Sequence, residues 1–396
     1  MAENESERQR GGRDGGRTLV EDAGGTRPFM RGILIHSLLS RGVAFEDAYA
    51  VAKQVREQLR GRQISREELG KTVAEVCDKD GIVVEAAPHS ISPEITVVSG
   101  DDATPFSKGI LSQSLLAAAL EPAEAWDVAR GIEERLVNES RRSVERGDLR
   151  RMAYEELLSA SRQRAARRYL VWRRYQDPDR PVVILLGGAA GVGKTSLALE
   201  VAHRLGIGRV ISTDAIRQVM RLMLSPELVP AIHSSSYDAW RVPGFEPTPG
   251  GDPVVEAFAA QASAVSVGIK AMIDRAIDEN ASLVLDGVSL LPGRLDLEAY
   301  AHRAHVVFLI VATFDGDAIR ARFTRRAEGE KARPPHRYLE NLEEILRIQD
   351  HILDQAEAND VPIVENLSFD RSVLSIIRQV TETLAKADGS DVAALL

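Results

Sequence analysis

The amino-acid sequence predicts an α/β fold in its C-terminal half, a parallel sheet with helices on both faces, preceded by two small α+β domains. Three observations lead to this prediction. Apolar strands alternate with helical segments after residue 180, a phosphate-binding motif follows the first of these strands, and one stretch of the N-terminal half occurs twice. Two copies indicate the duplication of a small domain rather than a solenoid, which needs roughly three or more units.

The composition bounds the class of protein. The chain has 396 residues, more than one typical domain, and its 44% hydrophobic and 28% charged residues are ordinary for globular proteins. The net charge of -9 disfavours a protein that coats nucleic acid. Cys77 has no second cysteine to pair with, and no apolar run stands out as long enough to cross a membrane, so we expect a cytoplasmic protein.

The two copies of the repeat run from Pro28 to Leu59 and from Pro105 to Leu136, with a constant offset of 77 residues. A short β-branched run and a Gly/Asp turn precede each copy and predict a β-hairpin. Apolar residues at three- and four-residue spacing then predict helices. We expect a disordered tail at 1–16, small α+β domains at 17–85 and 94–161, and the sheet domain at 170–388.

The hairpin followed by PFMRGIL in the first copy and PFSKGIL in the second resembles the ATP-cone, a small regulatory nucleotide-binding domain known from ribonucleotide reductases. The resemblance covers roughly Thr18 to Glu85 and Glu94 to Ser161. It implies that Arg31 and Lys108, at equivalent positions, face the phosphates of a regulatory nucleotide, either ATP or dATP. Alternatively, the two domains are vestigial or only mediate assembly into a homo-oligomer.

Residues 181–196 read PVVILLGGAAGVGKTS and match the phosphate-binding pattern G-x-x-x-x-G-K-[ST] between a strand and a helix. The glycines let backbone N–H groups surround a phosphate at the positive end of the helix. Lys194 is expected to reach the outer phosphates, and the hydroxyl of Thr195 to ligate Mg2+. The predicted ATP or GTP site, as opposed to a plain glycine-rich turn, consists of Gly188, Gly191, Val192, Gly193, Lys194, Thr195 and Ser196.

Near-continuous apolar strands after this loop predict a parallel sheet covered on both faces, with its ligands at the carboxyl edge. We expect strands at 182–186, 209–212, 283–285, 305–312 and 361–364. Helices are expected near 196–205, 215–224, 254–279, 339–359 and 371–385.

Polar residues follow two of these strands. Asp214 is expected to act as a base or as a water-mediated partner of Mg2+, and Arg217 and Arg221 share one helix face on which an anionic substrate can be clamped. The alternative is an N-cap aspartate with surface arginines. Asp286 ends the third strand, the position of an acid that orients Mg2+.

Two further segments carry candidate residues. Residues 320–337 are rich in arginine; in small-molecule P-loop kinases a mobile arginine segment closes over the nucleotide, and Arg322 and Arg326 share one helical face here. A solvated basic helix is the alternative. Secondary candidates for the acceptor pocket, or for a polar surface loop, are His233, Ser235 and Tyr237.

The motifs GGAAGVGKTS, ISTDAIRQVMR, HSSSYDAW, LVLDGVSLLPG and RPPHRYLENLEEILRIQDHILDQA, in this order, resemble 2-phosphoglycerate kinases over about Pro181 to Asn366. Members of that family carry an ATP-cone before the kinase domain. The resemblance implies phosphoryl transfer from ATP to the 3-hydroxyl of 2-phosphoglycerate, giving 2,3-bisphosphoglycerate. This chain departs from the family in its second cone, in Asp286 and Ser289 where Glu and His are common, and in a Pro/Gly-rich insertion at 242–253.

Two rival functions stay open. One is a kinase of the same fold that acts on another small acceptor, such as a hydroxy acid or a nucleotide sugar. The other is a nucleotide-sensing regulator with a weak ATPase activity and DNA binding. The arginine-rich stretch 162–174 supports the regulator, although a solvated helix face explains it as well and the acidic chain makes nucleic acid an unfavourable partner.

Overall fold

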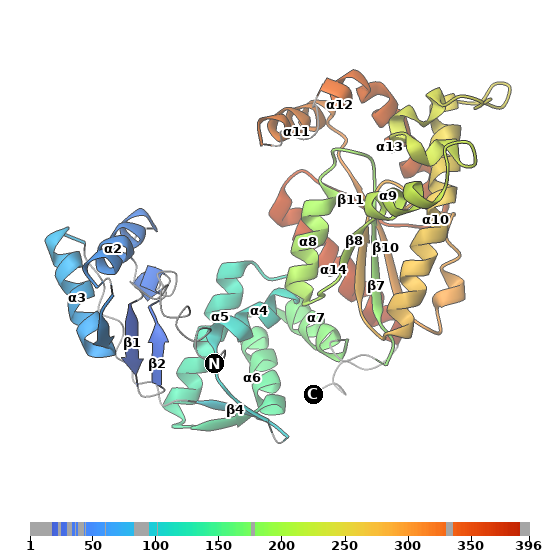
Figure 1. Cartoon of the computed structure of the whole chain (residues 1–396). Coiled ribbons are helices and arrows are strands. Elements are labelled where there is room, and N and C mark those ends of the chain that lie inside the picture. Colours follow the sequence, from blue (N-terminus) through green and yellow to red (C-terminus); the bar gives the residue numbers. More distant parts are fainter. Residues whose placement is uncertain are drawn as a thin grey trace, which may run out of the picture. The chain divides into compact units, whose positions relative to one another are not determined.

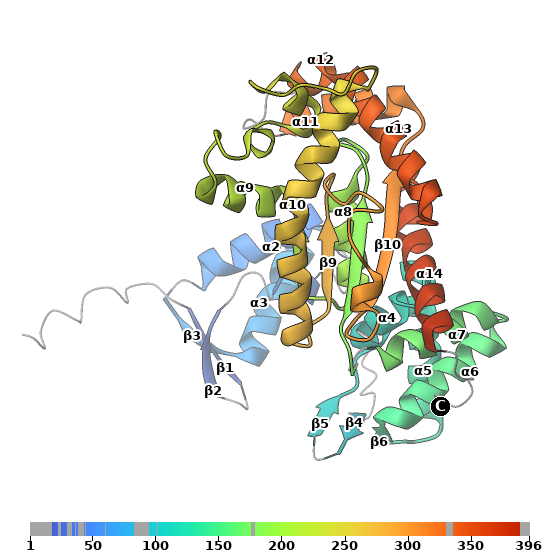
Figure 2. The ribbon, with the colours of Figure 1, turned by 90° about the vertical axis from the view of Figure 1, so that its right-hand side faces the viewer.

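The computed structural model contains two compact units, residues 1–92 and 93–396, which are shown in Figures 1 and 2. It describes residues 18–22, 25–29, 34–35, 37–38, 43, 45–59, 61–82, 95–100, 102–175, 179–329 and 336–388. The expected tail at 1–16 and Arg31 therefore lie outside the described residues.

The first unit is built on a three-stranded sheet. Strands β1 (Leu19–Asp22) and β2 (Gly25–Pro28) form an antiparallel hairpin, and β3 (Gln63–Ser65) pairs with β1 in parallel, which gives the order β2-β1-β3. Helix α3 (Arg66–Lys79) packs against this sheet and against α2 (Phe45–Gln58).

The second unit opens with the same arrangement. Strands β4 (Thr96–Ser99) and β5 (Asp102–Pro105) form the hairpin and β6 (Ser143–Glu145) pairs with β4 in parallel, in the order β5-β4-β6. Leu19 pairs with Pro28 in the first unit, and Thr96 with Pro105 in the second, 77 positions later in each case. The duplication predicted from the sequence is therefore present in the fold. The helices of this part are α4 (Lys108–Leu116), α5 (Pro122–Asn138) and α6 (Arg146–Ser159).

Helix α7 (Gln163–Arg174) belongs to two hydrophobic cores at once. Its Tyr169 and Leu170 are buried with the residues of the β4–β6 domain, whereas Val171 and Trp172 are buried in the core of the large sheet. The helix thus begins between the end expected for the second small domain, residue 161, and the start expected for the sheet domain, residue 170. One helix therefore joins both folded parts of the second unit.

The large sheet has five parallel strands in the order β11-β10-β7-β9-β8. Every residue of β7 and β9 is buried, as expected for central strands with both faces covered. The strands are β7 (Val182–Gly187), β8 (Val210–Ser212), β9 (Leu283–Asp286), β10 (His305–Ala312) and β11 (Ile363–Glu365), each close to its expected position.

Helices cover both faces of this sheet. Helices α8 (Lys194–Leu205) and α14 (Phe369–Asp388) pack together on one face, and α10 (Pro253–Asp278) and α13 (Leu342–Ala358) on the other (Figures 1 and 2). The remaining helical segments are α9 (Thr213–Met223), α11 (Gly316–Gly329), α12 (His336–Glu340), and the 3-10 turns Pro230–His233, Ser236–Arg241 and Glu298–Tyr300.

The helix expected at 339–359 is two helices in the structure, which corrects that prediction. Asn341 lies between α12 and α13, where its Nδ2 donates to the Arg337 carbonyl at 2.6 Å and its Oδ1 accepts from Arg241 Nη1 at 2.7 Å. A side-chain amide that bonds the neighbouring backbone competes with helical hydrogen bonds, which explains the break.

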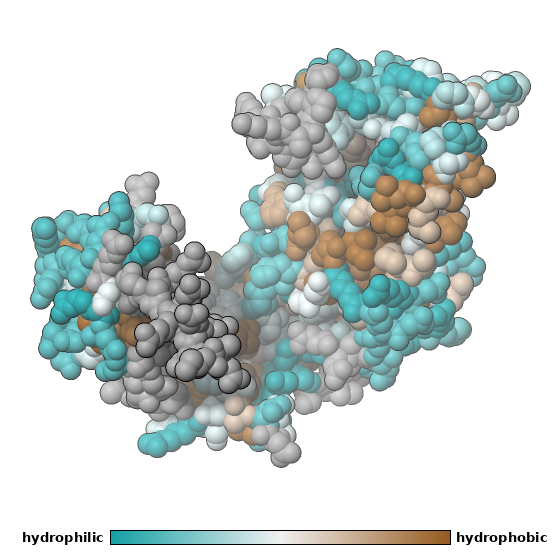
Figure 3. Space-filling model, in the orientation of Figure 1, coloured by the Kyte–Doolittle hydropathy of each residue, from teal (hydrophilic) through white to brown (hydrophobic). Residues whose placement is uncertain are grey.

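Helix α10 corrects the expectation that no apolar segment of the chain is long enough to cross a membrane. Within the described residues it is the one helix long and apolar enough to cross a membrane by length and composition. Phe258, Val265 and Ile269 are fully buried in the core of the sheet domain, so packing against the sheet accounts for its apolar character. Exposed apolar side chains gather on α9 and its neighbours (Figure 3): Val219, Leu222, Met223, Leu228 and Val267.

Candidate active site

The phosphate-binding loop connects β7 to α8, as the sequence predicted. Gly188 has a φ of 137°, and a Cβ atom there would lie 2.1 Å from the Val311 carbonyl oxygen. Gly191 has a φ of 84°, and a Cβ atom there would lie 2.5 Å from the Phe323 ring. Only glycine fits both positions, because the backbone conformation and the neighbouring atoms exclude a side chain.

Lys194 and Thr195 begin α8 beside the end of β9. The Lys194 side chain is buried, and its Nζ donates to the Ala189 carbonyl at 2.6 Å. The Thr195 hydroxyl donates to Asp286 Oδ2 at 2.6 Å. Ser196, also expected at the nucleotide, is exposed at the start of the helix.

Asp286 is buried with only 2% of its surface exposed. Its Oδ1 is buried too and has no hydrogen-bond partner in the described part of the chain. Burial raises the pKa of this carboxyl, the Thr195 hydrogen bond and the Lys194 charge lower it, and the nearby charge of Asp214 raises it. A buried carboxylate oxygen without a donor, next to a threonine hydroxyl, is suited to a hard cation such as Mg2+.

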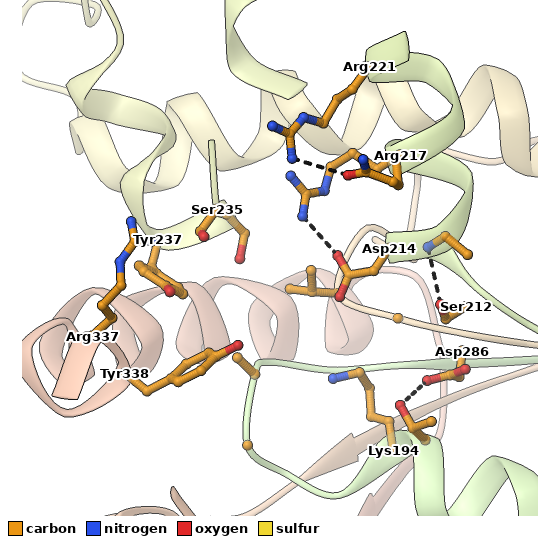
Figure 4. A pocket seen from close by; sticks show the side chains of 18 residues that line it. Lys194, Ser212, Asp214, Arg217, Arg221, Ser235, Tyr237, Asp286, Arg337 and Tyr338 are labelled. Carbon is orange, nitrogen blue, oxygen red and sulfur yellow. Dashed lines mark hydrogen bonds and ion pairs between the residues drawn. The ribbon is translucent and has the colours of Figure 1, made fainter. Parts of the chain in front are cut away.

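A cavity of about 720 Å³ joins the phosphate-binding loop to the carboxyl edge of the sheet. Figure 4 shows Asp214, Arg217 and Arg221 on one side of it and Arg337 and Tyr338 on the other. Side chains from separate segments of the chain line this one space: Lys194, Thr195, Ser212, Asp214, Arg217, Gln218, Arg221, Ser235, Tyr237, Asp286, Arg337 and Tyr338.

Asp214 lies in the first turn of α9 but does not cap that helix. Ser212 is the N-cap, because its hydroxyl accepts from the Ala215 amide at 3.1 Å. The alternative of an N-cap aspartate is therefore wrong. The Asp214 carboxylate is 56% exposed at the cavity and accepts from Arg217 Nη2 at 3.2 Å.

The two arginines of α9 differ in how they are held. Arg217 Nη1 donates to the carbonyls of Ile232 at 3.1 Å and Ser234 at 2.6 Å, so this side chain fixes the HSSSY segment to α9. Arg221 Nη1 donates to Gln218 Oε1 at 3.2 Å, and its Nε is buried without a partner in the described residues. Arg221 therefore keeps more hydrogen-bonding capacity for an anion than Arg217 does.

A second cavity of about 540 Å³ continues past the arginines toward the insertion at 242–253. His233 and Ser235 line it, and His233 Nε2 lies 2.9 Å from the Leu224 carbonyl oxygen. Val242 and Pro243, the start of the insertion, also border this space. The insertion thus adjoins the cavity where an acceptor is expected to bind.

Arg322, which was expected to close over the nucleotide, lines neither cavity. Arg322 is bound by three oxygens: Nη1 donates to the Val192 carbonyl at 3.1 Å and to Thr313 Oγ1 at 2.8 Å, and Nη2 donates to the Asn366 carbonyl at 2.5 Å. The side chain of Arg326 lies outside the described residues. Arg322 therefore supports the phosphate-binding loop through its hydrogen bond to the Val192 carbonyl.

Sequence reasoning missed Arg337 and Tyr338, which line the first cavity. The Tyr338 ring stacks on Phe323, with centroids 4.8 Å apart and planes at 13°, and meets Tyr237 edge-on at 5.7 Å. Phe323 is also the ring next to Gly191. Both missed residues lie at the end of the arginine-rich stretch, and this place in the sequence was the one signal that could have pointed to them.

A third cavity of about 290 Å³ lies in the β4–β6 domain. Arg146, Arg150 and Arg173 line it together with Tyr169, and burial, followed by the charges of Arg150 and Arg146, lowers the pKa of Arg173. Lys108, the residue expected there, does not line it, because its Nζ pairs with Glu133 at 2.8 Å. The arginine-rich stretch is thus more than a solvated helix face, since Arg173 borders a cavity.

The comparisons with known proteins agree with this arrangement. The ATP cone domain family matches residues 97–178, which includes the whole of α7. The chain is 37% identical over 290 residues to the 2-phosphoglycerate kinase of Pyrococcus horikoshii, covering 72% of this chain and 94% of that protein. It is 38% identical over 288 residues to the 2-phosphoglycerate kinase of Methanocaldococcus jannaschii, covering 72% of this chain and 91% of that protein.

Similarity to solved structures is weaker. A gluconokinase from Sinorhizobium meliloti aligns with 52% of this chain and 94% of its own, at 17% identity and a TM-score of 0.30. A shikimate kinase from Acinetobacter baumannii aligns at 14% identity and a TM-score of 0.28, over 50% of this chain and 90% of its own. These similarities are too weak to bear on the function of this chain.

Proposed function

This chain belongs to the 2-phosphoglycerate kinase family, and we propose that it transfers the γ-phosphoryl group of ATP to the 3-hydroxyl group of 2-phosphoglycerate. One observation carries the proposal: a single cavity is bordered by the phosphate-binding loop on one side and by Arg217, Arg221 and Arg337 on the other. The first side suits a triphosphate, and the second suits a small acceptor that bears several negative charges.

In the proposed reaction the acceptor hydroxyl oxygen forms a bond to the γ-phosphorus while the bond from that phosphorus to the β–γ bridging oxygen breaks, and ADP leaves. Asp214, which is exposed at the cavity, receives the hydroxyl proton. Lys194 and the loop amides stabilise the charge on the transferred group and on ADP. Catalysis then consists mainly of positioning and charge stabilisation.

The residues present fit Mg2+. Thr195 and Asp286 would hold the ion, directly or through water, and the buried Oδ1 of Asp286 would gain the cationic partner that it lacks. When bound, Mg2+ neutralises negative charge on the phosphate oxygens. The described residues contain no group of three or more His, Cys, Asp or Glu side chains able to hold a metal, which agrees with an ion held largely by the nucleotide.

The β4–β6 domain binds a regulatory nucleotide in this proposal. Its arginine-lined cavity supports the assignment, because three guanidinium groups without an acidic side chain among the lining residues favour an anion. The first unit has the same strand order and register, and we extend the proposal to it as a second ATP cone.

The experiment that tests the function measures ADP released by the purified protein with magnesium-ATP, with and without 2-phosphoglycerate. Strong stimulation by 2-phosphoglycerate, and little by 3-phosphoglycerate, is the expected result. Equal stimulation by both acids, or stimulation only by another acceptor, would contradict the proposed substrate and favour a kinase for a different small molecule. ADP release that responds to no acceptor, together with salt-sensitive DNA binding, would favour the nucleotide-sensing regulator.

A further inference from the structure

Arg337 borders the two active-site cavities from the side opposite α9. It lines the cavity beside the phosphate-binding loop and also the one beside the insertion, and its side chain is 57% exposed. Figure 4 shows it across the pocket from Arg217 and Arg221. Its Nη2 atom lies 3.4 Å from Oδ2 of Asp238, which is longer than a good charged hydrogen bond.

Asp238 is already paired with another arginine. Arg241 Nη1 donates to Asp238 Oδ1 at 2.5 Å and to Asn341 Oδ1 at 2.7 Å, and Arg241 Nη2 donates to Glu344 Oε1 at 2.9 Å. Arg241 also lines the second cavity, but three acceptors already occupy its guanidinium. Arg337, by contrast, meets a carboxylate whose charge is already balanced, so its own charge is available to an anion in the cavity.

The opposite end of the pocket offers an anion two guanidinium groups rather than one. Arg221 and Arg217 lie one helical turn apart on α9, and the buried Nε of Arg221 has no partner in the described residues. A phosphate dianion is matched better by two guanidinium groups than by one, whereas one planar guanidinium matches a carboxylate through two parallel hydrogen bonds. The two ends of the pocket therefore suit two different anionic groups.

We propose that Arg337 binds the carboxylate of the acceptor, while Arg221 and Arg217 bind its phosphate. Arg337 is then a specificity-determining residue that selects acceptors with both groups, and Asp238 is a positioning residue that keeps the Arg337 guanidinium at the cavity. This inference rests on the proposed function, since 2-phosphoglycerate carries a carboxylate and a phosphate on the same carbon atom.

The test compares 2-phosphoglycerate with glycerol 2-phosphate, in which an uncharged hydroxymethyl group replaces the carboxylate. We expect Arg337→Gln to lower kcat/KM for 2-phosphoglycerate by roughly 10- to 100-fold, mainly through KM, the loss of one charged hydrogen-bonded contact. For glycerol 2-phosphate, kcat/KM should change by less than about 2-fold, because the contact is absent in the wild type as well. The KM for ATP should stay unchanged in both assays.

Arg303→Gln is the matched control. Arg303 is 48% exposed, lies 3.2 Å from Asp274, and precedes β10 at the edge of the sheet away from the cavity. It should leave both acceptors unaffected. The same fall for both acceptors in Arg337→Gln, or no fall for either, would overturn the inference.

Failure of the proposed function gives a different result, because the wild type itself would then release no ADP with 2-phosphoglycerate. Calorimetric binding of 2-phosphoglycerate and glycerol 2-phosphate to the same variants tests the inference in that case as well. A loss of affinity limited to 2-phosphoglycerate and to Arg337→Gln supports it. Equal affinities in wild type and variant overturn it.

Discussion

Arg322 offers the sharpest test of how the phosphate-binding loop is held. Its guanidinium binds the Val192 carbonyl of the loop, the buried Thr313 hydroxyl and the buried Asn366 carbonyl. In Arg322→Ala the Val192 carbonyl keeps Asn366 Nδ2 as a donor at 2.7 Å, whereas the other two acceptors lose this donor. At about 1–3 kcal/mol for each buried acceptor left without a donor, the free energy of unfolding should fall by about 2–6 kcal/mol.

For a domain of this size that loss corresponds to a melting temperature lower by about 5–15 °C. Thermal denaturation followed by circular dichroism measures it, with Arg320→Ala as the control, since Arg320 lies on the same helix with an exposed side chain. The KM for ATP should rise as well, because the loop loses a support. A wild-type melting temperature combined with a kcat reduced by more than about 100-fold would refute this role and favour an arginine that touches the transferred group.

Three further predictions concern the nucleotide sites. Lys194→Ala should lower kcat/KM by more than about 100-fold with little change in melting temperature, since the lysine acts on the phosphates; full turnover would refute the site. Burial raises the pKa of the Asp286 carboxyl in the folded protein. The folded protein therefore loses stability as the pH rises through that pKa. Without Mg2+, Asp286→Asn should have a higher melting temperature than the wild type near neutral pH. This difference should shrink as the pH falls below about 3, where the carboxyl is protonated in both states, and a difference independent of pH would contradict it. In the Lys194→Ala background, calorimetry should still detect ATP at the β4–β6 domain, and adding Arg150→Gln should weaken that binding by about 10-fold; unchanged binding would place the nucleotide elsewhere.

Much of the fold was predictable because local patterns determine it. Buried parallel strands read as apolar runs, so all five strands of the large sheet were found, and a constant offset of 77 residues was enough to predict two copies of one hairpin. The break between α12 and α13 was missed because the Asn341 side chain that bonds the neighbouring Arg337 carbonyl also binds Arg241, a hundred residues earlier. Long-range contacts of this kind leave no periodic trace in the sequence.

The candidate site residues also differ in how far local sequence patterns determine their positions. Lys194, Thr195 and Asp286 were predicted because a strand end and a loop motif fix their positions in any fold of this class. The roles of the arginines were harder to predict, since an arginine in a sequence is equally compatible with lining a cavity, supporting a loop or lying on a solvated helix face. Arg322 was expected at the transferring phosphoryl group and instead binds two backbone carbonyls and the Thr313 hydroxyl, whereas Arg337, fifteen residues later, lines the cavity.

Helix α7 has a consequence for how the second unit comes apart. Because Tyr169 and Trp172 of one helix are buried in two different cores, neither core survives intact when this helix is removed or frayed. The β4–β6 domain and the sheet domain should therefore denature in one cooperative transition, and a cut near residue 165 should leave the β4–β6 domain without Tyr169 and Leu170 and unable to fold. The folding of the second copy of the duplicated domain is thus coupled to that of the sheet domain that follows it.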